Sequence, residues 1–298
     1  MRRALRWLGW VVGGVLTIAI IAGSVLYVLG GRRLNQRFDV EPELIAIPTD
    51  SAVIARGRHL ASAAFCHACH GDDLSGGVMT SMPGVMTLAA PNLTAGRGGA
   101  GTRLTDADYL RAIRHGVNAD GRGLLIMHAD AFHNLDRDDL AAIVAYAKSV
   151  PPVDREVATR IAPLGRIMVA LGLFDSDQIP PIPAEVIDHG APFVEAPPAD
   201  TTAAYGRYLV SFSLCGMCHG RDLRGAPPID PSYAPGPNIV HRAGPAGWTR
   251  EQFMTVMRTG ITPDGRTLNA EWMPWEVYAR LSDRELTAIW LSIEAMAR

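Results

Sequence analysis

Two stretches of this chain resemble each other at a constant offset, and this internal repeat constrains the fold more than any other feature. Residues 55–77 read ARGRHLASAAFCHACHGDDLSGG, and residues 204–226 read AYGRYLVSFSLCGMCHGRDLRGA. The similarity continues with small gaps, because the stretch from Thr105, TDADYLRAIRHGVNADGRGL, matches the stretch from Thr249, TREQFMTVMRTGITPDGRTL. A repeated sequence predicts a repeated structural unit. The chain is therefore expected to hold two homologous units of roughly 100 residues each.

An apolar segment precedes the repeat. Residues 7–31 carry no charge, and a helix of that length extends about 37 Å, which is enough to cross a hydrocarbon core of about 30 Å. A cleavable signal peptide is the alternative, but the long apolar run and the lack of a small-x-small cleavage site favour an uncleaved anchor. The arginines on its two sides are equal in number, so they do not orient it. Beyond residue 37 acidic residues outnumber basic ones, which argues against nucleic-acid binding.

Helical patterns recur in both units, and neither unit has a clear alternating strand. A threonine cap and a closing glycine predict a helix from Thr105 to Gly116, with a copy from Thr249 to Gly260. Residues 151–203 are rich in proline and are expected to form an irregular linker with a short helix around residues 164–173. The predicted fold is all-α, and its organisation is a membrane anchor (1–37), a first domain (38–150), the linker (151–203) and a second domain (204–298).

The four cysteines fall into two C-x-x-C-H motifs at matching positions of the repeat. The first motif holds Cys66, Cys69 and His70, and the second holds Cys215, Cys218 and His219. Cysteines three residues apart reach the two vinyl groups of one haem, and the next histidine projects toward the iron. A Cys₄ zinc site, a thioredoxin-like pair and structural disulfides leave the histidines or the repeat unexplained. The motifs therefore predict two covalently bound haem c groups, which would also supply much of the core of two small domains.

The repeat selects candidates for the second axial ligand of each iron. Of the methionines, only Met127 and Met273 coincide between the units, and both lie in a loop just before the last helix. A Met/His pair raises the reduction potential relative to two histidines. In the first unit His128 or His133 could replace Met127. The other histidines are interpreted as neighbours of solvent or of haem propionates: His59, His67, His115, His189 and His241.

Together these motifs resemble class I cytochrome c domains. The resemblance rests on G-R-x-L before C-x-x-C-H-G, the P-N-L/I loop, the G-x-x-x-D-G-R turn, the axial-methionine loop and a terminal L-x-x-I helix. The resemblance covers residues 52–150 and 204–297. The chain as a whole is similar to membrane-anchored multihaem cytochromes c. Among these it most resembles the cytochrome subunit of bacterial membrane-bound alcohol and sugar dehydrogenases.

The resemblance implies further residues and a location. The carbonyls of Pro91 and Pro237 would accept a hydrogen bond from Nδ1 of the two motif histidines. Arg122 and Arg266 would pair with haem propionates, with plain surface charge as an equal alternative. Haem is attached outside the cytoplasmic membrane in bacteria, so the chain would be a single-pass protein of that inner membrane with its domains in the periplasm.

The predicted function is electron transfer rather than catalysis. The chain would relay electrons from a dehydrogenase or quinol-oxidising complex toward a terminal oxidase or soluble cytochrome in a respiratory chain. The alternative is a dihaem redox enzyme of the peroxidase or thiosulfate-oxidising type, in which one axial ligand is displaceable.

Overall fold

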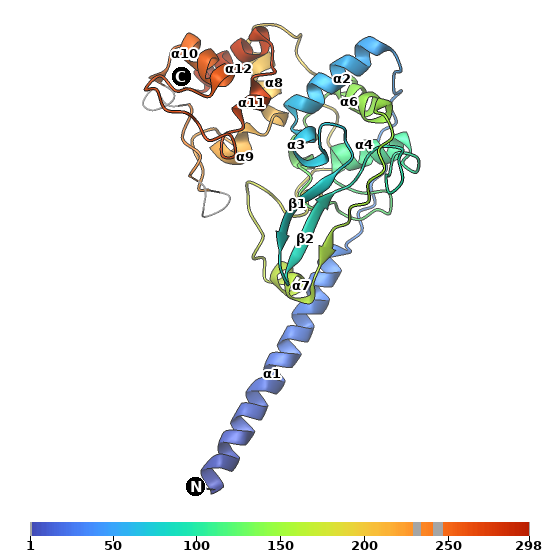
Figure 1. Ribbon diagram of the computed structural model, residues 1–298, viewed down its shortest axis with the longest axis vertical. Helices are drawn as coiled ribbons and strands as arrows, with labels where there is room; N and C mark the ends of the chain where they lie inside the picture. Colours follow the sequence, from blue (N-terminus) through green and yellow to red (C-terminus); the bar gives the residue numbers. More distant parts are fainter. Residues whose placement is uncertain (1, 229–233, 241–246, 298) are drawn as a thin grey trace.

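The computed structural model describes residues 2–228, 234–240 and 247–297, and it shows a globular part with one long helix projecting from it (Figure 1). That helix, α1 (Arg2–Leu34), is long and apolar enough to cross a membrane, and no residue of its most apolar window is buried. The expected apolar segment is therefore present as one continuous helix.

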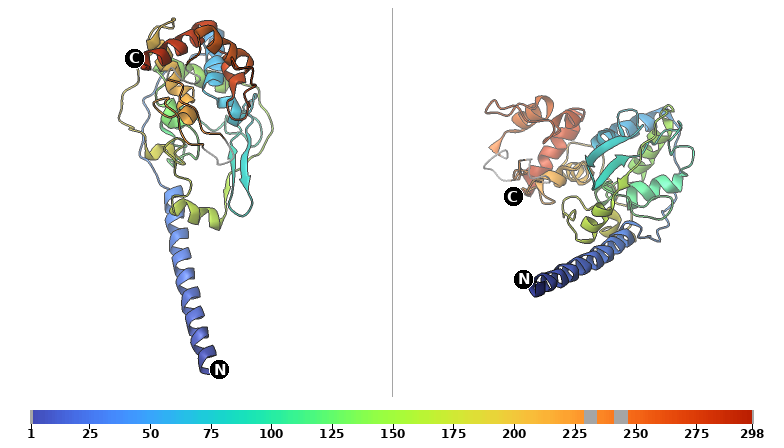
Figure 2. Two further views of the ribbon diagram at one scale, coloured as in Figure 1. Left: turned by 90° about the vertical axis from the view of Figure 1, so that its left-hand side faces the viewer. Right: turned by 60° about the horizontal axis from the view of Figure 1, so that its bottom comes forward.

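The two units of the repeat follow the same order of helices. The first unit contains α2 (Ser51–Ala63), α3 (Cys66–His70), α4 (Asp106–His115), α5 (Ala129–Phe132) and α6 (Arg137–Ser149). The second contains α8 (Ala203–Phe212), α9 (Cys215–His219), α10 (Arg250–Thr259), α11 (Trp275–Tyr278) and α12 (Asp283–Met296). Thr105 and Thr249 cap α4 and α10, and left-handed glycines at 116 and 260 end them, as the sequence predicted. Figure 2 shows the two groups side by side above α1.

In each unit the first and last helices cross at a glycine. A Cβ atom at Gly57 would lie 1.8 Å from the carbonyl oxygen of Ala142, and one at Gly206 would lie 1.8 Å from that of Ala288. These are equivalent positions of the repeat. A side chain there would force the helices apart, so the two glycines set the close crossing of α2 with α6 and of α8 with α12.

The expectation of no strands was wrong for the first unit. Its β1 (Gly77–Met82) pairs antiparallel with β2 (Met86–Ala90), and β2 pairs with β3 (Arg160–Ile161) from the linker. Alternate side chains of β2 are buried, and Pro83-Gly84 makes the turn with Gly84 at φ 75°. The strands are short, and one of them comes from the linker, so the local pattern was too weak to show them.

The linker packs on the first unit rather than hanging free. It carries the expected short helix as α7 (Pro163–Ala170), followed by a 3₁₀ turn, η1 (Pro183–Glu185). The Asn92 side chain donates to the carbonyl of Val153 at 2.8 Å, and Arg114 donates to the carbonyls of Ala191 and Pro192 at 2.9 and 3.0 Å. Residues beyond position 150 therefore complete the first unit.

Candidate metal centres

Both cysteine motifs sit on short helices that begin and end in the same unusual backbone. Phe65 before α3 and Leu214 before α9 are left-handed, with φ 60° and 59°, and each helix is closed by a glycine with φ 79° or 82°. A non-glycine residue in this region is strained, so equivalent strain at both sites indicates a shape that the surroundings enforce. All four cysteines are free of disulfides and partly buried.

The two motif histidines make the contacts expected of iron ligands. Nδ1 of His70 lies 3.0 Å from the carbonyl oxygen of Pro91, and Nδ1 of His219 lies 2.8 Å from that of Pro237. A carbonyl only accepts, so Nδ1 carries the proton and Nε2 keeps its lone pair for a metal. Burial lowers the pKa of both rings, which keeps them neutral at pH 7. The donor set and its orientation thus fit a haem iron in both units.

The two candidate axial methionines occupy matching turns. Met127 and Met273 are both partly buried against the main hydrophobic core. The carbonyl of Met127 accepts from the amide of Ala129 at 2.6 Å, and that of Met273 accepts from Trp275 at 2.7 Å. Met257, in contrast, is buried on a helix face, as expected for a core residue. The assignment of the two loop methionines as ligands remains a prediction.

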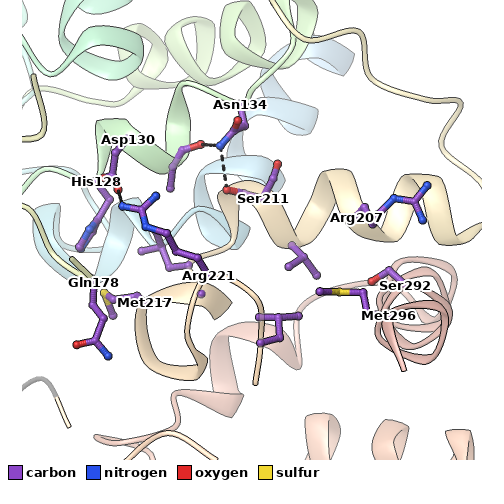
Figure 3. A pocket seen from close by; sticks show the side chains of 15 residues that line it. His128, Asp130, Asn134, Gln178, Arg207, Ser211, Met217, Arg221, Ser292 and Met296 are labelled. Atoms are coloured by element: carbon purple, nitrogen blue, oxygen red, sulfur yellow. Dashed lines mark hydrogen bonds and ion pairs between the residues drawn. The ribbon is translucent and has the colours of Figure 1, made fainter. Parts of the chain in front are cut away.

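The two histidines that could compete with Met127 lie in different surroundings. Nδ1 of His133 donates a hydrogen bond to the carbonyl of Arg114 at 3.1 Å, and Nε2 of the same ring is buried without a hydrogen-bond partner. His128 lines a cavity shared with the second unit, beside Gln178 and Met217 (Figure 3). Burial lowers the pKa of both rings.

The two arginines of the D-G-R turns are exposed. The Arg266 side chain pairs with Asp264 at 2.6 Å. The hydrogen bonds given for Arg122 are made by its backbone, whose amide donates to the Asn118 side chain at 2.9 Å and whose carbonyl accepts from the Asn118 amide at 2.8 Å. Both side chains are therefore surface charges in this structure, and their pairing with haem propionates remains a prediction.

The structure shows what several other histidines contact, and among them His115, which is 4% exposed, does not face solvent. His115, His133 and His189 form a cluster, with Nδ1 of His115 3.2 Å from Nδ1 of His189. Burial and the neighbouring cationic groups lower the pKa of His115 to about 4. His67 contacts the Tyr146 hydroxyl at 3.0 Å. The repeat gave no sign of this cluster because the second unit lacks its counterparts. His241 lies outside the described residues.

The two units meet through equivalent surfaces. One cavity between them has a volume of about 350 Å³. Within it Asp130 and Asn134 face Arg221 and Ser211 (Figure 3). A second cavity, of about 550 Å³, lies around His59. Equivalent positions of the repeat line both cavities: Arg58 and Arg207, Ser62 and Ser211, His67 and Gly216, Asp72 and Arg221, Arg280 and Asn134. The units therefore face each other in an approximately two-fold arrangement.

An aromatic contact joins the two cysteine motifs across this interface. The ring of Phe65, directly before Cys66, meets the ring of Tyr278 edge-on at 5.3 Å. The Tyr278 hydroxyl donates to the carbonyl of Ser213 at 2.8 Å and lies 3.8 Å from Sγ of Cys215. The two attachment segments are thus linked through one buried side chain.

An ion pair at the same interface predicts a pH dependence. His59 Nε2 lies 2.8 Å from Glu285, and the hydrogen bond to that carboxylate raises the pKa of His59. Burial pushes the pKa of Glu285 up, but hydrogen bonds from His59 and Ser282 hold it below its ordinary value. The pair is formed in full below the ordinary His pKa of about 6.5 and above the ordinary Glu pKa of about 4.3. It is lost as pH rises through the raised pKa of His59, or falls through the lowered pKa of Glu285.

We therefore expect wild-type thermal stability to decline as pH rises above about 6.5, and His59→Gln to lack that decline. Thermal melts from about pH 5 to about pH 9 would measure it. Glu285→Gln should remove the same slope. A His59→Gln profile that runs parallel to wild type would contradict the assignment.

Comparisons with known proteins agree with this geometry. Residues 54–151 match the family model of cytochrome c. The chain is 30% identical over 232 residues to the fructose dehydrogenase cytochrome subunit of Gluconobacter japonicus, covering 72% of this chain and 46% of that protein. It is 28% identical over 245 residues to the cytochrome c subunit of a quinone alcohol dehydrogenase of Gluconacetobacter polyoxogenes, covering 71% and 48%. It is 30% identical over 183 residues to the gluconate 2-dehydrogenase cytochrome c subunit of Pantoea cypripedii, and the match covers 57% of this chain and 38% of that protein. The chain spans about half the length of the first two relatives and less of the third.

Proposed function

Because the chain carries a cytochrome c domain and is homologous to cytochrome c subunits of bacterial dehydrogenases, we propose that it is a membrane-anchored dihaem electron carrier. It would take electrons from a dehydrogenase partner and pass them on toward a quinone, an oxidase or a soluble cytochrome of the respiratory chain. The observation that carries the proposal is the second motif, where His219 repeats the carbonyl contact of His70 although the family model covers only the first unit.

The roles of the chain's residues follow from their positions. When bound, each haem supplies an iron that gains and loses one electron. Cys66 and Cys69, and their counterparts Cys215 and Cys218, would hold the two groups by thioether bonds. The proline carbonyls fix the tautomer and direction of His70 and His219. With Met127 and Met273 as the sixth ligands, both irons would stay fully coordinated, which suits transfer rather than catalysis.

Two features support a relay through both units. The contact between Phe65 and Tyr278 places the two attachment segments on either side of one packed interface. A single hydrophobic core also runs through both units, so their relative placement is built into the fold. A fixed placement keeps the separation of two carriers constant.

The membrane anchor is also proposed as permanent. Arg33, at the end of α1, pairs with Asp175 at 2.8 Å and with Glu185 at 2.7 Å. Cleavage of α1 as a signal peptide would remove these bonds and uncover the linker. We place the globular part in the periplasm because haem attachment at C-x-x-C-H motifs occurs there.

The test is the haem content of the full-length chain purified from membranes. Two covalent haems per chain are expected by pyridine haemochrome assay and intact mass. Cys66→Ala with Cys69→Ala should leave one haem, and Cys215→Ala with Cys218→Ala should leave the other. One haem in the wild type would overturn the dihaem proposal, and sustained turnover of peroxide would overturn the carrier role in favour of a redox enzyme.

A further inference from the structure

The linker helix α7 is bound to the end of α1 and not only to the globular part. Gly30 of α1 faces the carbonyl of Arg166, where a Cβ atom would lie only 1.8 Å from the oxygen. The guanidinium of Arg166 sits 5.0 Å above the ring of Tyr27. One turn further on, Arg33 donates to the carbonyl of Val169 at 3.3 Å. Figures 1 and 2 show α7 at the base of the globular part, against the upper end of α1.

The contacts between α7 and α1 determine how deep α7 lies relative to the membrane. About 20 residues of helix fill a hydrocarbon core of about 30 Å, so the charge-free segment of residues 7–31 is used up close to Tyr27. Tyrosine favours the boundary between hydrocarbon and headgroups, and Arg32 and Arg33 lie beyond it. A helix packed beside Tyr27, Gly30 and Arg33 therefore lies at that boundary.

The outer side of α7 is apolar. Leu164 and Leu171 lie on one helix face and are 50% and 53% exposed, and Leu173 in the next turn is 61% exposed. Residues 161–174 carry a single charge, Arg166, and its side chain turns toward α1. Acidic residues begin only at Asp175, which pairs with Arg33. Three exposed leucines beside the end of an anchor match an interfacial segment with one apolar side.

We propose that residues 163–173 lie in the surface of the lipid bilayer, with the three leucines among the upper acyl chains. The inference rests on the proposed membrane anchor. Lipid is the occupant because the surface continues directly from α1, which passes through the same bilayer.

The contact would fix the haem-binding part relative to the membrane. A Cβ atom at Gly165 would lie 2.4 Å from the carbonyl of Val85, so α7 is seated on the turn between β1 and β2. Strand β1 begins at Gly77, shortly after His70. The bilayer would therefore hold the first centre through α7 as well as through the single helix α1, which limits the surface that a partner in the same membrane can reach.

Photocrosslinking of the full chain in nanodiscs of phosphatidylethanolamine and phosphatidylglycerol tests this. A p-benzoylphenylalanine residue would replace Leu171, with Val15 inside α1 as the positive control. Ile261, 47% exposed in the second unit, is the matched negative control. We expect lipid adducts at Leu171 and Val15 and none at Ile261. An adduct at Val15 without one at Leu171 overturns the inference and leaves the anchor standing, whereas no adduct at Val15 overturns both.

Two further experiments test whether the leucines hold the insertion and whether lipid is the occupant in native membranes. Leu171→Glu with Leu173→Glu should abolish the lipid adduct of a probe at Leu164 while haem content and absorption spectrum stay unchanged. Persistence of that adduct would contradict an insertion held by the leucines. In native membranes the Leu171 probe should again label lipid, and labelling of a protein chain instead would show that a partner subunit covers this face.

Discussion

Replacing Met273 by leucine is expected to lower the reduction potential of one haem by on the order of 0.1 V, leaving the other unchanged. Leucine keeps the volume of the side chain but has no sulfur to donate to iron. The loss of thioether ligation removes the stabilisation of ferrous iron that a Met/His pair provides. A redox titration that follows the absorption spectrum would resolve the two potentials, and the Met–iron charge-transfer band should halve.

The buried Met257 supplies the matched control. It lies on a face of α10 within the core, so Met257→Leu should leave both potentials and the charge-transfer band in place. An unchanged spectrum for Met273→Leu would rule out Met273 as the ligand.

Met127→Leu adds a test of the competing histidines. If His128 or His133 replaces the methionine in the wild type, the first haem should already lack the charge-transfer band, and Met127→Leu should change nothing. If Met127 is the ligand, the band should fall by half.

The local shape of both centres was predictable because it is set within short stretches of sequence. The Cys66 and Cys215 motifs and the caps of α4 and α10 are each determined by neighbours along the chain. The repeat added weight, since a feature found twice at equivalent positions is rarely accidental. The hydrogen bonds from His70 and His219 to the proline carbonyls were expected from the resemblance to cytochrome c domains, not from the local sequence.

What the sequence did not reveal depends on contacts between distant segments. His59 and Glu285 are 226 residues apart, and neither belongs to a recognisable motif. The close packing of α7 against α1 depends on Gly30, and in the sequence this glycine is indistinguishable from the rest of the apolar segment. The strand β3 exists because the linker returns to the first unit. Each of these needs a partner that local periodicity cannot supply.

Asp139 is a buried charged residue that contacts both units. It is 1% exposed and accepts hydrogen bonds from Arg56 of its own unit, with Nε at 2.7 Å, and from the Tyr208 hydroxyl of the other unit, also at 2.7 Å. The same hydroxyl accepts from the backbone amide of Asp136 at 3.1 Å. Burial and the Asp139 carboxylate raise the pKa of Tyr208, so it remains a donor at neutral pH.

Asp139→Asn should therefore destabilise the chain by roughly 2 kcal/mol and separate the unfolding of the two units. An amide has one acceptor oxygen, so either Arg56 or Tyr208 loses its partner, and the charge opposite Arg56 disappears. Calorimetry should show the single wild-type transition replaced by two, with the haem spectra unchanged at low temperature. Asp138→Asn is the control, since its neighbouring carboxylate is exposed and should behave as wild type. Equal melting of the two variants would show that the bond between Tyr208 and Asp139 contributes nothing to holding the units together.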